Sequence, residues 1–393
     1  MSATRREGDW LGVPEALARV VAACRPLGGE SMASAEAGGR VVAEHVRAPI
    51  AHPPWTNSAM DGFAVRAVDV RAATRERPAR LRVVENVPAG GFPTRSVGAG
   101  EATRVMTGAP IPDGADGVIR IEHTSAWDAA GAPDAIDVYR DDDAGRNVRR
   151  RGEDYAEGDA LLTPGAVLTP ARIGLLASIG AASVVVARRP RVAILSTGDE
   201  LAGPDAFDEV RAGRRIADSN TAALAVAIAE AGGVALPLGI ARDDVDDIAA
   251  HLERARGADI LLTTAGASVG DHDLAKDALD RAGFALDFWR VRMRPGSPVS
   301  FGRLDETLVF GLPGNPVSAL VTFHVLVAPA IRALQGRRDM HSPVERVVLA
   351  EPMQTKAGLA HFLRVRLEPG ETGPADARLT GPQGSGILTS VSA

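Results

Sequence analysis

The stretch DILLTTAGASVGDHD, Asp259–Asp273, favours an α/β fold because an apolar run leads directly into a loop rich in glycine and aspartate. Such a run is typical of a parallel strand that is covered on both faces. Gly266 and Gly270 allow backbone N–H groups to turn toward an anion, and Asp271 and Asp273 offer the carboxylate oxygens that Mg²⁺ prefers. A strand followed by a solvated turn is the alternative, since glycine and aspartate are also common turn residues.

Two further strand ends repeat this pattern. The run RVAILS at 191–196 leads into TGDE at 197–200, and TLVFGL at 307–312 leads into PGNP at 313–316. A parallel sheet brings the carboxyl ends of its strands to one edge, where ligands bind. We therefore expect the acids of these loops to form one site, namely Asp199, Glu200, Asp271 and Asp273.

Helices are expected between the strands. The pair Ser219–Asn220 is suited to cap a helix over Thr221–Glu230, and the pair Asp243–Asp244 is suited to open one that runs to Arg256. Alternation of strand and helix predicts a doubly wound, mostly parallel sheet.

Three arginines alternate in FWRVRMRPGSP, Phe288–Pro298. If this segment is a strand, Arg290, Arg292 and Arg294 lie on one face, where paired guanidinium donors suit a phosphate or another tetrahedral dianion. A solvated edge strand is the alternative. The adjoining loops favour a binding role for Arg290 and Arg294 and leave Arg292 undecided.

The PGNP turn precedes an expected helix over Val317–Ile331. Its first-turn amides carry a partial positive charge suited to an oxyanion, and Ser318 adds a hydroxyl. Pro313 and Pro316 are equally common as ordinary residues of a helix start.

Two upstream segments carry further acids. HPPWTNSAMDGFAV, His52–Val65, contains Asp61 in an Asp-Gly pair, which by itself indicates a structural turn. NVRRRGEDYAEGD, Asn147–Asp159, places arginines beside Glu153 and Asp154. Such a mixed charge run is either a self-neutralising surface loop or an acid and a phosphate clamp for a neighbouring domain.

The motifs NSAMDGFAV, RRRGEDYAEGD, STGDEL, ASVGDHD, MRPGSPVSFG and GLPGNPVSA occur in this order. Together they resemble those of the molybdopterin molybdenumtransferases, the bacterial molybdenum insertases, which are similar to the E domain of gephyrin. The resemblance implies hydrolysis of the phosphoanhydride of adenylated molybdopterin, release of AMP and transfer of molybdate to the dithiolene, with Mg²⁺ as cofactor. Metal and guanidinium groups would screen the charge on the phosphoryl oxygens.

By matching motifs, the resemblance implies catalytic roles for Asp61, Asp154 and Glu200, and a Mg²⁺ site formed by Glu200, Asp271 and Asp273. The substrate-binding residues that it implies are Ser196, Thr197, Gly198, Gly266, Ser268, Arg290, Arg294, Pro298, Pro313, Gly314, Asn315, Ser318, Arg364 and Ser385.

Ser297 departs from the family, which commonly has a lysine there, whereas Arg290 and Arg294 replace family lysines and keep the charge. A lost cation beside a dianion weakens binding by on the order of one to a few kcal/mol when the pair is desolvated. We expect either weaker molybdate affinity or replacement of that cation by Arg364.

Composition agrees with a soluble cytoplasmic enzyme. The formal net charge is −6 over 393 residues, which gives no electrostatic case for nucleic acid or an anionic membrane. The single cysteine, Cys24, excludes an internal disulfide and is expected in the core. We expect no long apolar span and no signal peptide.

The resemblance implies an α/β multidomain chain. Residues 1–48 and 144–190 would form an elongated N-terminal dimerisation domain, and 49–143 an inserted β-rich domain. Residues 191–337 would form the doubly wound molybdopterin-binding domain, and 338–393 a small C-terminal β domain, truncated relative to the family. The implied partners are a second copy in a homodimer with a shared active site, and the molybdopterin adenylyltransferase.

Three alternatives stay open. A gephyrin-like scaffold would keep the fold without the chemistry, but it does not require the converging acids. The adenylating enzyme of the same pathway shares a similar sheet domain but lacks the N-terminal units and PGNPVS. Tungstate is nearly identical to molybdate in size and charge, so the sequence does not separate the two.

Overall fold

The computed structural model describes the chain from residue 10 to residue 392, apart from 128–132, 265–273 and 371–372. It divides into two compact units. Unit 1 comprises Met1–Glu44, Thr163–Ala177 and Ala181–Ala393, and unit 2 comprises His45–Leu162 and Ser178–Gly180. The finer division into four domains stays a prediction.

Unit 1 contains a six-stranded sheet with the strand order β15-β12-β16-β20-β19-β17. The first four strands are parallel, and β19 and β17 are antiparallel to their neighbours. The three strands predicted to end at one edge, β12, β16 and β20, are indeed neighbours in this order. The strands are β15 (Val234–Ala241), β12 (Arg191–Thr197), β16 (Ile260–Thr264), β20 (Thr307–Leu312), β19 (Ser300–Leu304) and β17 (Ala285–Trp289).

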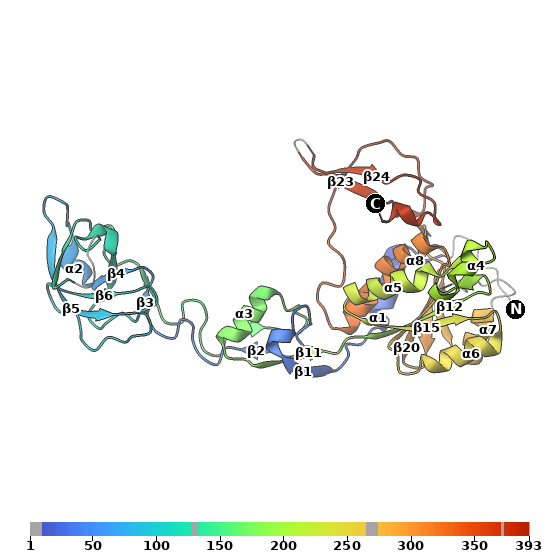
Figure 1. Cartoon of the computed structure of the whole chain (residues 1–393), viewed down its shortest axis with the longest axis horizontal. Coiled ribbons are helices and arrows are strands. Elements are labelled where there is room, and N and C mark those ends of the chain that lie inside the picture. The colour runs from blue at the N-terminus through green and yellow to red at the C-terminus, as the bar shows by residue number, and fades with distance from the viewer. Residues whose placement is uncertain (1–9, 128–132, 265–273, 371–372, 393) are drawn as a thin grey trace. The chain divides into compact units, whose positions relative to one another are not determined.

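Helices cover both faces of this sheet (Figure 1). Val192 and Ile194 of β12 pack into one apolar core, whereas Ala193 and Leu195 pack into the other. Successive side chains of a strand point to opposite faces, so a continuous apolar run requires two covering layers. One layer contains α1 (Val13–Ala23), α5 (Ser219–Glu230), α8 (Pro316–Thr322) and α9 (Ala328–Leu334), and the other contains α6 (Val245–Arg254) and α7 (Leu274–Arg281).

Side chains cap the starts of α5 and α6, and the first of these caps corrects the prediction. The side chain of Asp218 accepts a hydrogen bond from the backbone N–H of Thr221 at 3.1 Å and caps α5. The predicted caps Ser219 and Asn220 lie inside the helix instead. Asp244 caps α6 as predicted.

The helix after the PGNP turn is longer than the predicted Val317–Ile331. The expectation that the chain has no long apolar span is therefore wrong. The helix runs from Pro316 to Leu334 through a π-helical turn, Phe323–Val327, and is long and apolar enough to cross a membrane by length and composition alone. However, 72% of its most apolar window is buried inside the protein, which is typical of a core helix. Phe323, Leu326 and Val327 belong to the core beside the sheet.

The arginine segment is not one continuous strand, which corrects the predicted alternation. Strand β17 ends at Trp289, Arg290 has a positive φ of 68°, and β18 covers only Met293–Arg294. β18 pairs in parallel with β22 (Ala360–His361), so Arg294 lies opposite His361. This pairing attaches the C-terminal segment to the sheet unit.

The C-terminal segment also forms a small three-stranded sheet. β24 (Asp376–Leu379) lies between β21 (Val348–Leu349) and β23 (Val365–Glu368). A short 3₁₀ helix, Leu388–Ser390, follows.

Unit 2 is built on a five-stranded sheet with the order β7-β4-β6-β5-β8 (Figure 1). Gly62 opens β4, and a Cβ there would lie 2.0 Å from the carbonyl oxygen of Ile119 on β7. The glycine of the Asp-Gly pair is thus required by close strand packing and not by a turn. The strands are β7 (Gly117–Arg120), β4 (Gly62–Val65), β6 (Glu101–Val105), β5 (Ala79–Val87) and β8 (Ala135–Val138).

The remaining strands form short two-stranded ladders, and further short helices lie outside the two main sheets. The pairs are β1 (Gly29–Ala33) with β11 (Ser183–Ala187), β2 (Val46–Arg47) with β10 (Ala160–Leu162), β3 (Asn57–Ser58) with β9 (Val148–Arg149), and β13 (Leu201–Ala202) with β14 (Ile216–Ala217). The helices are α2 (Ala67–Val70), α3 (Pro170–Ser178) and α4 (Phe207–Arg211).

Candidate functional site

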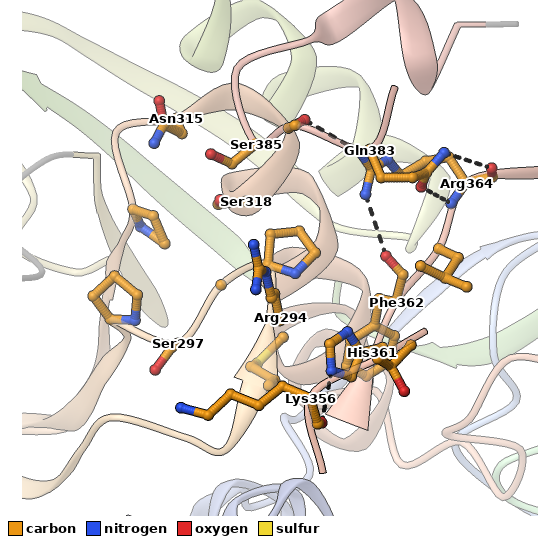
Figure 2. A pocket seen from close by; sticks show the side chains of 18 of the residues that line it. Arg294, Ser297, Asn315, Ser318, Lys356, His361, Phe362, Arg364, Gln383 and Ser385 are labelled. Atoms are coloured by element: carbon orange, nitrogen blue, oxygen red, sulfur yellow. Dashed lines mark hydrogen bonds between the residues drawn. The ribbon is translucent and has the colours of Figure 1, made fainter. Parts of the chain in front are cut away.

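A cavity of about 620 Å³ lies in unit 1, between the turn after β18, the start of α8 and the C-terminal segment (Figure 2). The cavity is lined by segments that are far apart in the sequence, namely 293–298, 313–318, 353–364 and 383–385. Of the predicted substrate-binding residues, those that line the cavity are Arg294, Pro298, Pro313, Asn315, Ser318, Arg364 and Ser385.

The lining of this cavity is cationic. Arg294, Lys356 and Arg364 bring three basic side chains to it, with His361 beside them (Figure 2). No aspartate or glutamate is among the described residues that line it. Because the whole chain has a formal net charge of −6, this positive lining is a local feature and favours an anionic ligand.

Arg364 is held in place by the C-terminal segment. Its side chain is only 8% exposed, and it donates from Nε to Ser390 Oγ at 3.2 Å and from Nη2 to the carbonyl oxygen of Gly384 at 3.2 Å. Nη1 donates to the carbonyl oxygen of Phe362 at 3.3 Å. Burial lowers the pKa of Arg364. A guanidinium has five N–H donors, so these three bonds leave donors for a ligand.

Lys356 and His361 line the cavity but were not predicted from the sequence. Lys356 is one of only two lysines in the chain, and its neighbour in the cavity, Arg364, follows eight residues later. The scarcity of lysine was the one feature of the sequence that set Lys356 apart. No local sequence pattern indicates that Lys356 lines the same cavity as Arg294. The other unpredicted lining residues are Met353, Gln354, Thr355, Phe362, Leu363, Gln383 and Gly384.

The start of α8 differs from the expected set of free amides. The backbone N–H of Val317 donates to the carbonyl oxygen of Ser385 at 3.2 Å, so this first-turn amide is occupied by the C-terminal segment. The bond also fixes Ser385 at the cavity, near the buried Ser318. Gly314 does not line the cavity, and its carbonyl oxygen accepts a hydrogen bond from Asn220 Nδ2 at 2.8 Å.

Arg290 lies outside the lining of the cavity. Its guanidinium carbon is 4.0 Å from the ring centroid of Trp289 and 4.8 Å from that of Trp10. Cation–π contacts of this kind stabilise a stacked arginine. The expected shared face with Arg294 is therefore wrong, and the role of Arg290 in substrate binding stays a prediction.

At the edge of the sheet, Ser196 is fully buried, and its hydroxyl lies 2.9 Å from Thr264 Oγ1 and 3.0 Å from Thr221 Oγ1. This hydroxyl network joins β12 and β16 to α5. Thr197 is also buried. Gly198 has a φ of +141°, a backbone conformation that strains other residues, so glycine is favoured there. Binding roles for these residues stay predictions.

The predicted metal site is only partly described. Asp271 and Asp273, with Gly266 and Ser268 of the same loop, lie outside the described residues, and Glu200 is exposed. Within the part of the chain that the structure covers, no group of three or more His, Cys, Asp or Glu residues is placed to hold a metal ion.

Asp243 lies beside Asp199 in the loop after β12, a contact that was not predicted from the sequence. The Asp199 backbone N–H donates to Asp243 Oδ2 at 3.3 Å, and the Asp243 N–H donates to Asp199 Oδ1 at 3.4 Å. Each carboxylate is thus held by the backbone of the other residue, and Asp199 directly precedes Glu200.

The two predicted acids of unit 2 have distinct surroundings. Asp61 Oδ1 accepts hydrogen bonds from the backbone N–H and the hydroxyl of Thr107, both at 2.7 Å. The hydrogen bond from the Thr107 backbone is the larger cause and the one from its hydroxyl the second, and both lower the pKa of Asp61. Asp61 is therefore a carboxylate near neutral pH. Asp154 lines a second cavity, of about 640 Å³, together with Glu153 and Trp55.

Comparisons with known proteins cover most of the chain. Residues 11–180 match the MoeA N-terminal region (domain I and II), and residues 193–333 match a family described as a probable molybdopterin binding domain. The chain is 37% identical over 358 residues to molybdopterin molybdenumtransferase 2 of Mycobacterium tuberculosis, covering 90% of this chain and 86% of that protein.

Two further relatives extend the likeness. The molybdopterin molybdenumtransferase of Bacillus subtilis is 37% identical over 326 residues, covering 83% of this chain and 75% of that protein. The crystal structure of the molybdopterin biosynthesis moeA protein from Pyrococcus horikoshii OT3 matches with a TM-score of 0.82 and 29% identity, covering 98% of this chain and 93% of that one. The fold and the sequence thus point to the same group of proteins.

Proposed function

We propose that this chain, which belongs to the molybdopterin molybdenumtransferase family, inserts molybdate into adenylated molybdopterin. The chain is a transferase of molybdenum cofactor biosynthesis. The proposed reaction hydrolyses the phosphoanhydride, releases AMP and leaves molybdenum on the dithiolene sulfurs.

The cationic cavity is the observation that carries this proposal. Molybdate is a tetrahedral dianion, and it requires several donors that converge without a competing carboxylate. Arg294, Lys356 and Arg364 supply positive charge around the cavity, and its described lining contains no acid. The hydroxyls of Ser297, Ser318 and Ser385 are additional donors in the same lining.

The acids are assigned to the phosphoanhydride. Asp61, Asp154 and Glu200 are the proposed catalytic residues, and the lowered pKa of Asp61 suits a group that stays ionised during turnover. Mg²⁺ is the proposed cofactor, held by Glu200 with Asp271 and Asp273. When bound, it would screen the charge on the phosphoryl oxygens. The pair Asp199 and Asp243 adds negative charge beside Glu200.

The test is release of AMP from adenylated molybdopterin, measured with and without Mg²⁺ and molybdate. We expect release to require Mg²⁺ and the product to contain molybdenum. Arg294→Ala should raise the molybdate concentration needed for half-maximal insertion, whereas Arg366→Ala, on an exposed site of β23, should not. An enzyme that releases no AMP under any of these conditions would contradict the proposal.

We also propose a homodimer with a shared active site in the cytoplasm, and the molybdopterin adenylyltransferase as the supplier of substrate. Mixing an Asp61→Ala chain with a Glu200→Ala chain tests the shared site. Recovered activity in the mixture supports acids contributed by two subunits, and persistent inactivity argues for a site within one chain.

Three further measurements separate the alternatives. Tight capture of a peptide without AMP release would identify a gephyrin-like scaffold. Consumption of ATP on molybdopterin would identify an adenylating enzyme. Competition between molybdate and tungstate in the insertion assay would rank the two oxyanions, which the cationic cavity alone does not distinguish.

A further inference from the structure

Unit 2 contains the cavity of about 640 Å³ in which Asp154 lies. Its walls are two segments joined by backbone hydrogen bonds. The N–H of His52 donates to the carbonyl oxygen of Tyr155 at 2.9 Å, and the N–H of Asp154 donates to that of His52 at 3.0 Å. The N–H of Gly152 donates to the carbonyl oxygen of Pro53 at 3.0 Å. The cavity is therefore a built feature of this unit and not a gap between mobile loops.

One wall of the cavity is apolar and flat. Trp55, which is 38% exposed, lines it with Pro53 and Pro54. The indole is held in position because Nε1 donates to the carbonyl oxygen of Gly108 at 3.3 Å and the ring of Phe92 packs edge-on at 5.0 Å. A large aromatic ring that is fixed in place and still accessible is suited to stack on a planar ligand.

The polar side chains of the cavity are mostly hydrogen-bond acceptors. Asn57 is only 6% exposed, and its Oδ1 has no hydrogen-bond partner among the described residues, although Nδ2 donates to the carbonyl oxygen of Trp55. A buried acceptor without a partner is costly, so a donor from a ligand would stabilise it. Asn57 pairs with Arg149 across β3 and β9, and both line the cavity.

The carboxylates of Glu153 and Asp154 add further acceptors. One oxygen of Glu153 accepts a hydrogen bond from the backbone N–H of Arg150 at 2.8 Å, which leaves the other oxygen for a ligand. Arg149 supplies a donor. The cavity thus offers a stacking face, several acceptors and one cationic donor.

We propose that this cavity binds the pterin ring, through its 2-amino-4-oxopyrimidine edge. That edge presents an amino group and a ring N–H as adjacent donors, which match Glu153 and Asn57, and a carbonyl oxygen, which matches Arg149. The ring stacks on Trp55. This inference rests on the proposed function for the identity of the natural ligand, because adenylated molybdopterin contains a pterin.

Adenine, the other planar ring of that substrate, fits less well. It presents a single amino donor beside a ring nitrogen that accepts, so it would leave either Glu153 or Asn57 without a donor. A site that hydrogen-bonds one ligand rejects another strongly when the second ligand leaves buried polar groups without partners. We therefore expect the cavity to bind the pterin more tightly than adenine.

The test uses the full-length chain and 6-hydroxymethylpterin, which has no phosphate and no dithiolene and so cannot use the cationic cavity. Calorimetry should detect binding that Trp55→Ala weakens about tenfold or more, as expected for loss of one stacking surface. Trp55→Phe keeps a ring and should weaken binding less. Glu153→Gln should also weaken it, and the side-chain amide signals of Asn57 should shift in NMR spectra on addition of the pterin.

Trp127→Ala is the matched control, because Trp127 is an exposed tryptophan of the same unit, at 56%, and does not line the cavity. Unchanged pterin affinity in Trp55→Ala would overturn the proposal. Trp55-dependent binding of AMP in place of the pterin would also overturn it. Molybdate titration of the same variants separates the two hypotheses: intact molybdate binding with no pterin binding leaves the proposed function standing and removes only this inference.

Discussion

His361 Nε2 donates a hydrogen bond to the backbone carbonyl oxygen of Lys356 at 3.1 Å. A carbonyl oxygen only accepts, so Nε2 of the imidazole must carry the proton. The bond closes the turn between Lys356 and β22, and β22 in turn pairs with the strand that holds Arg294. The backbone of Lys356 is thereby tied, through β22, to the strand that holds Arg294.

Lys356→Ala should weaken molybdate binding about tenfold at low ionic strength, because it removes a cation from the cavity, and less as salt screens the charge. Calorimetric titration of molybdate measures the change. Lys276→Ala is the control, since it removes the other lysine of the chain, which is paired with Asp280 on α7. Equal affinity of Lys356→Ala and wild type would contradict an anion-binding role for Lys356.

His361→Ala should also weaken molybdate binding, but less than Lys356→Ala, because it loosens the turn without removing the ammonium. His361→Gln retains an N–H donor within reach of the Lys356 carbonyl oxygen and should restore most of the affinity. If His361 acts as an anion ligand itself, His361→Gln will bind as weakly as His361→Ala. Molybdate titration of the two variants decides between positioning and direct contact.

Ser297→Lys should strengthen molybdate binding, because it adds a cation to a lining that lacks one at this position. Combining it with Lys356→Ala forms a double-mutant cycle. If the two positions serve the same anion, the gain from Ser297→Lys will be larger when Lys356 is absent. No gain in either background would mean that a cation at 297 is irrelevant in this chain.

Arg364→Ala should lower the free energy of unfolding by about 2–3 kcal/mol, since it removes three hydrogen bonds, to Ser390 Oγ and to the carbonyl oxygens of Phe362 and Gly384. Molybdate binding should fall as well. Denaturant unfolding and titration measure the two effects. Arg366→Ala, on an exposed site of β23 two residues away, is the control and should change neither.

Thr107→Val should raise the pKa of Asp61 toward its ordinary value, because it removes the hydroxyl bond and keeps the backbone one. The depressed pKa stabilises the folded state above the unfolded pKa of about 4, and this contribution is lost as pH falls through the folded pKa. As pH falls, Thr107→Val should therefore lose this stabilisation of the folded state at a higher pH than wild type does.

Carbon NMR of the Asp61 carboxyl group measures this shift in pKa directly. Thr94→Val is the matched control in the same unit, because Thr94 donates to Glu85 in a similar way and does not contact Asp61. An unchanged Asp61 pKa in Thr107→Val would assign the whole effect to the backbone bond.

The strand and helix pattern was predictable because it depends on local periodicity. The run at 191–196, the turn at 313–316 and the cap at Asp244 follow from apolar spacing and the conformational preferences of single residues. The same reasoning failed at Arg290, where the positive φ and the stacking on Trp10 and Trp289 interrupt the strand. Trp10 is far away in the sequence, so no local pattern reveals that contact.

The motifs of the sequence alone determined the alternating sheet unit and placed Arg294, Asn315, Ser318, Arg364 and Ser385 together by resemblance. Only the tertiary structure brought Lys356 and His361 to the same cavity and occupied the Val317 amide with Ser385. It also left Asn57 Oδ1, beside Trp55, without a hydrogen-bond partner among the residues that the structure describes. Periodicity and capping act between near neighbours in the chain. Contacts between distant segments depend on how the elements pack, and many different sequences satisfy the same packing.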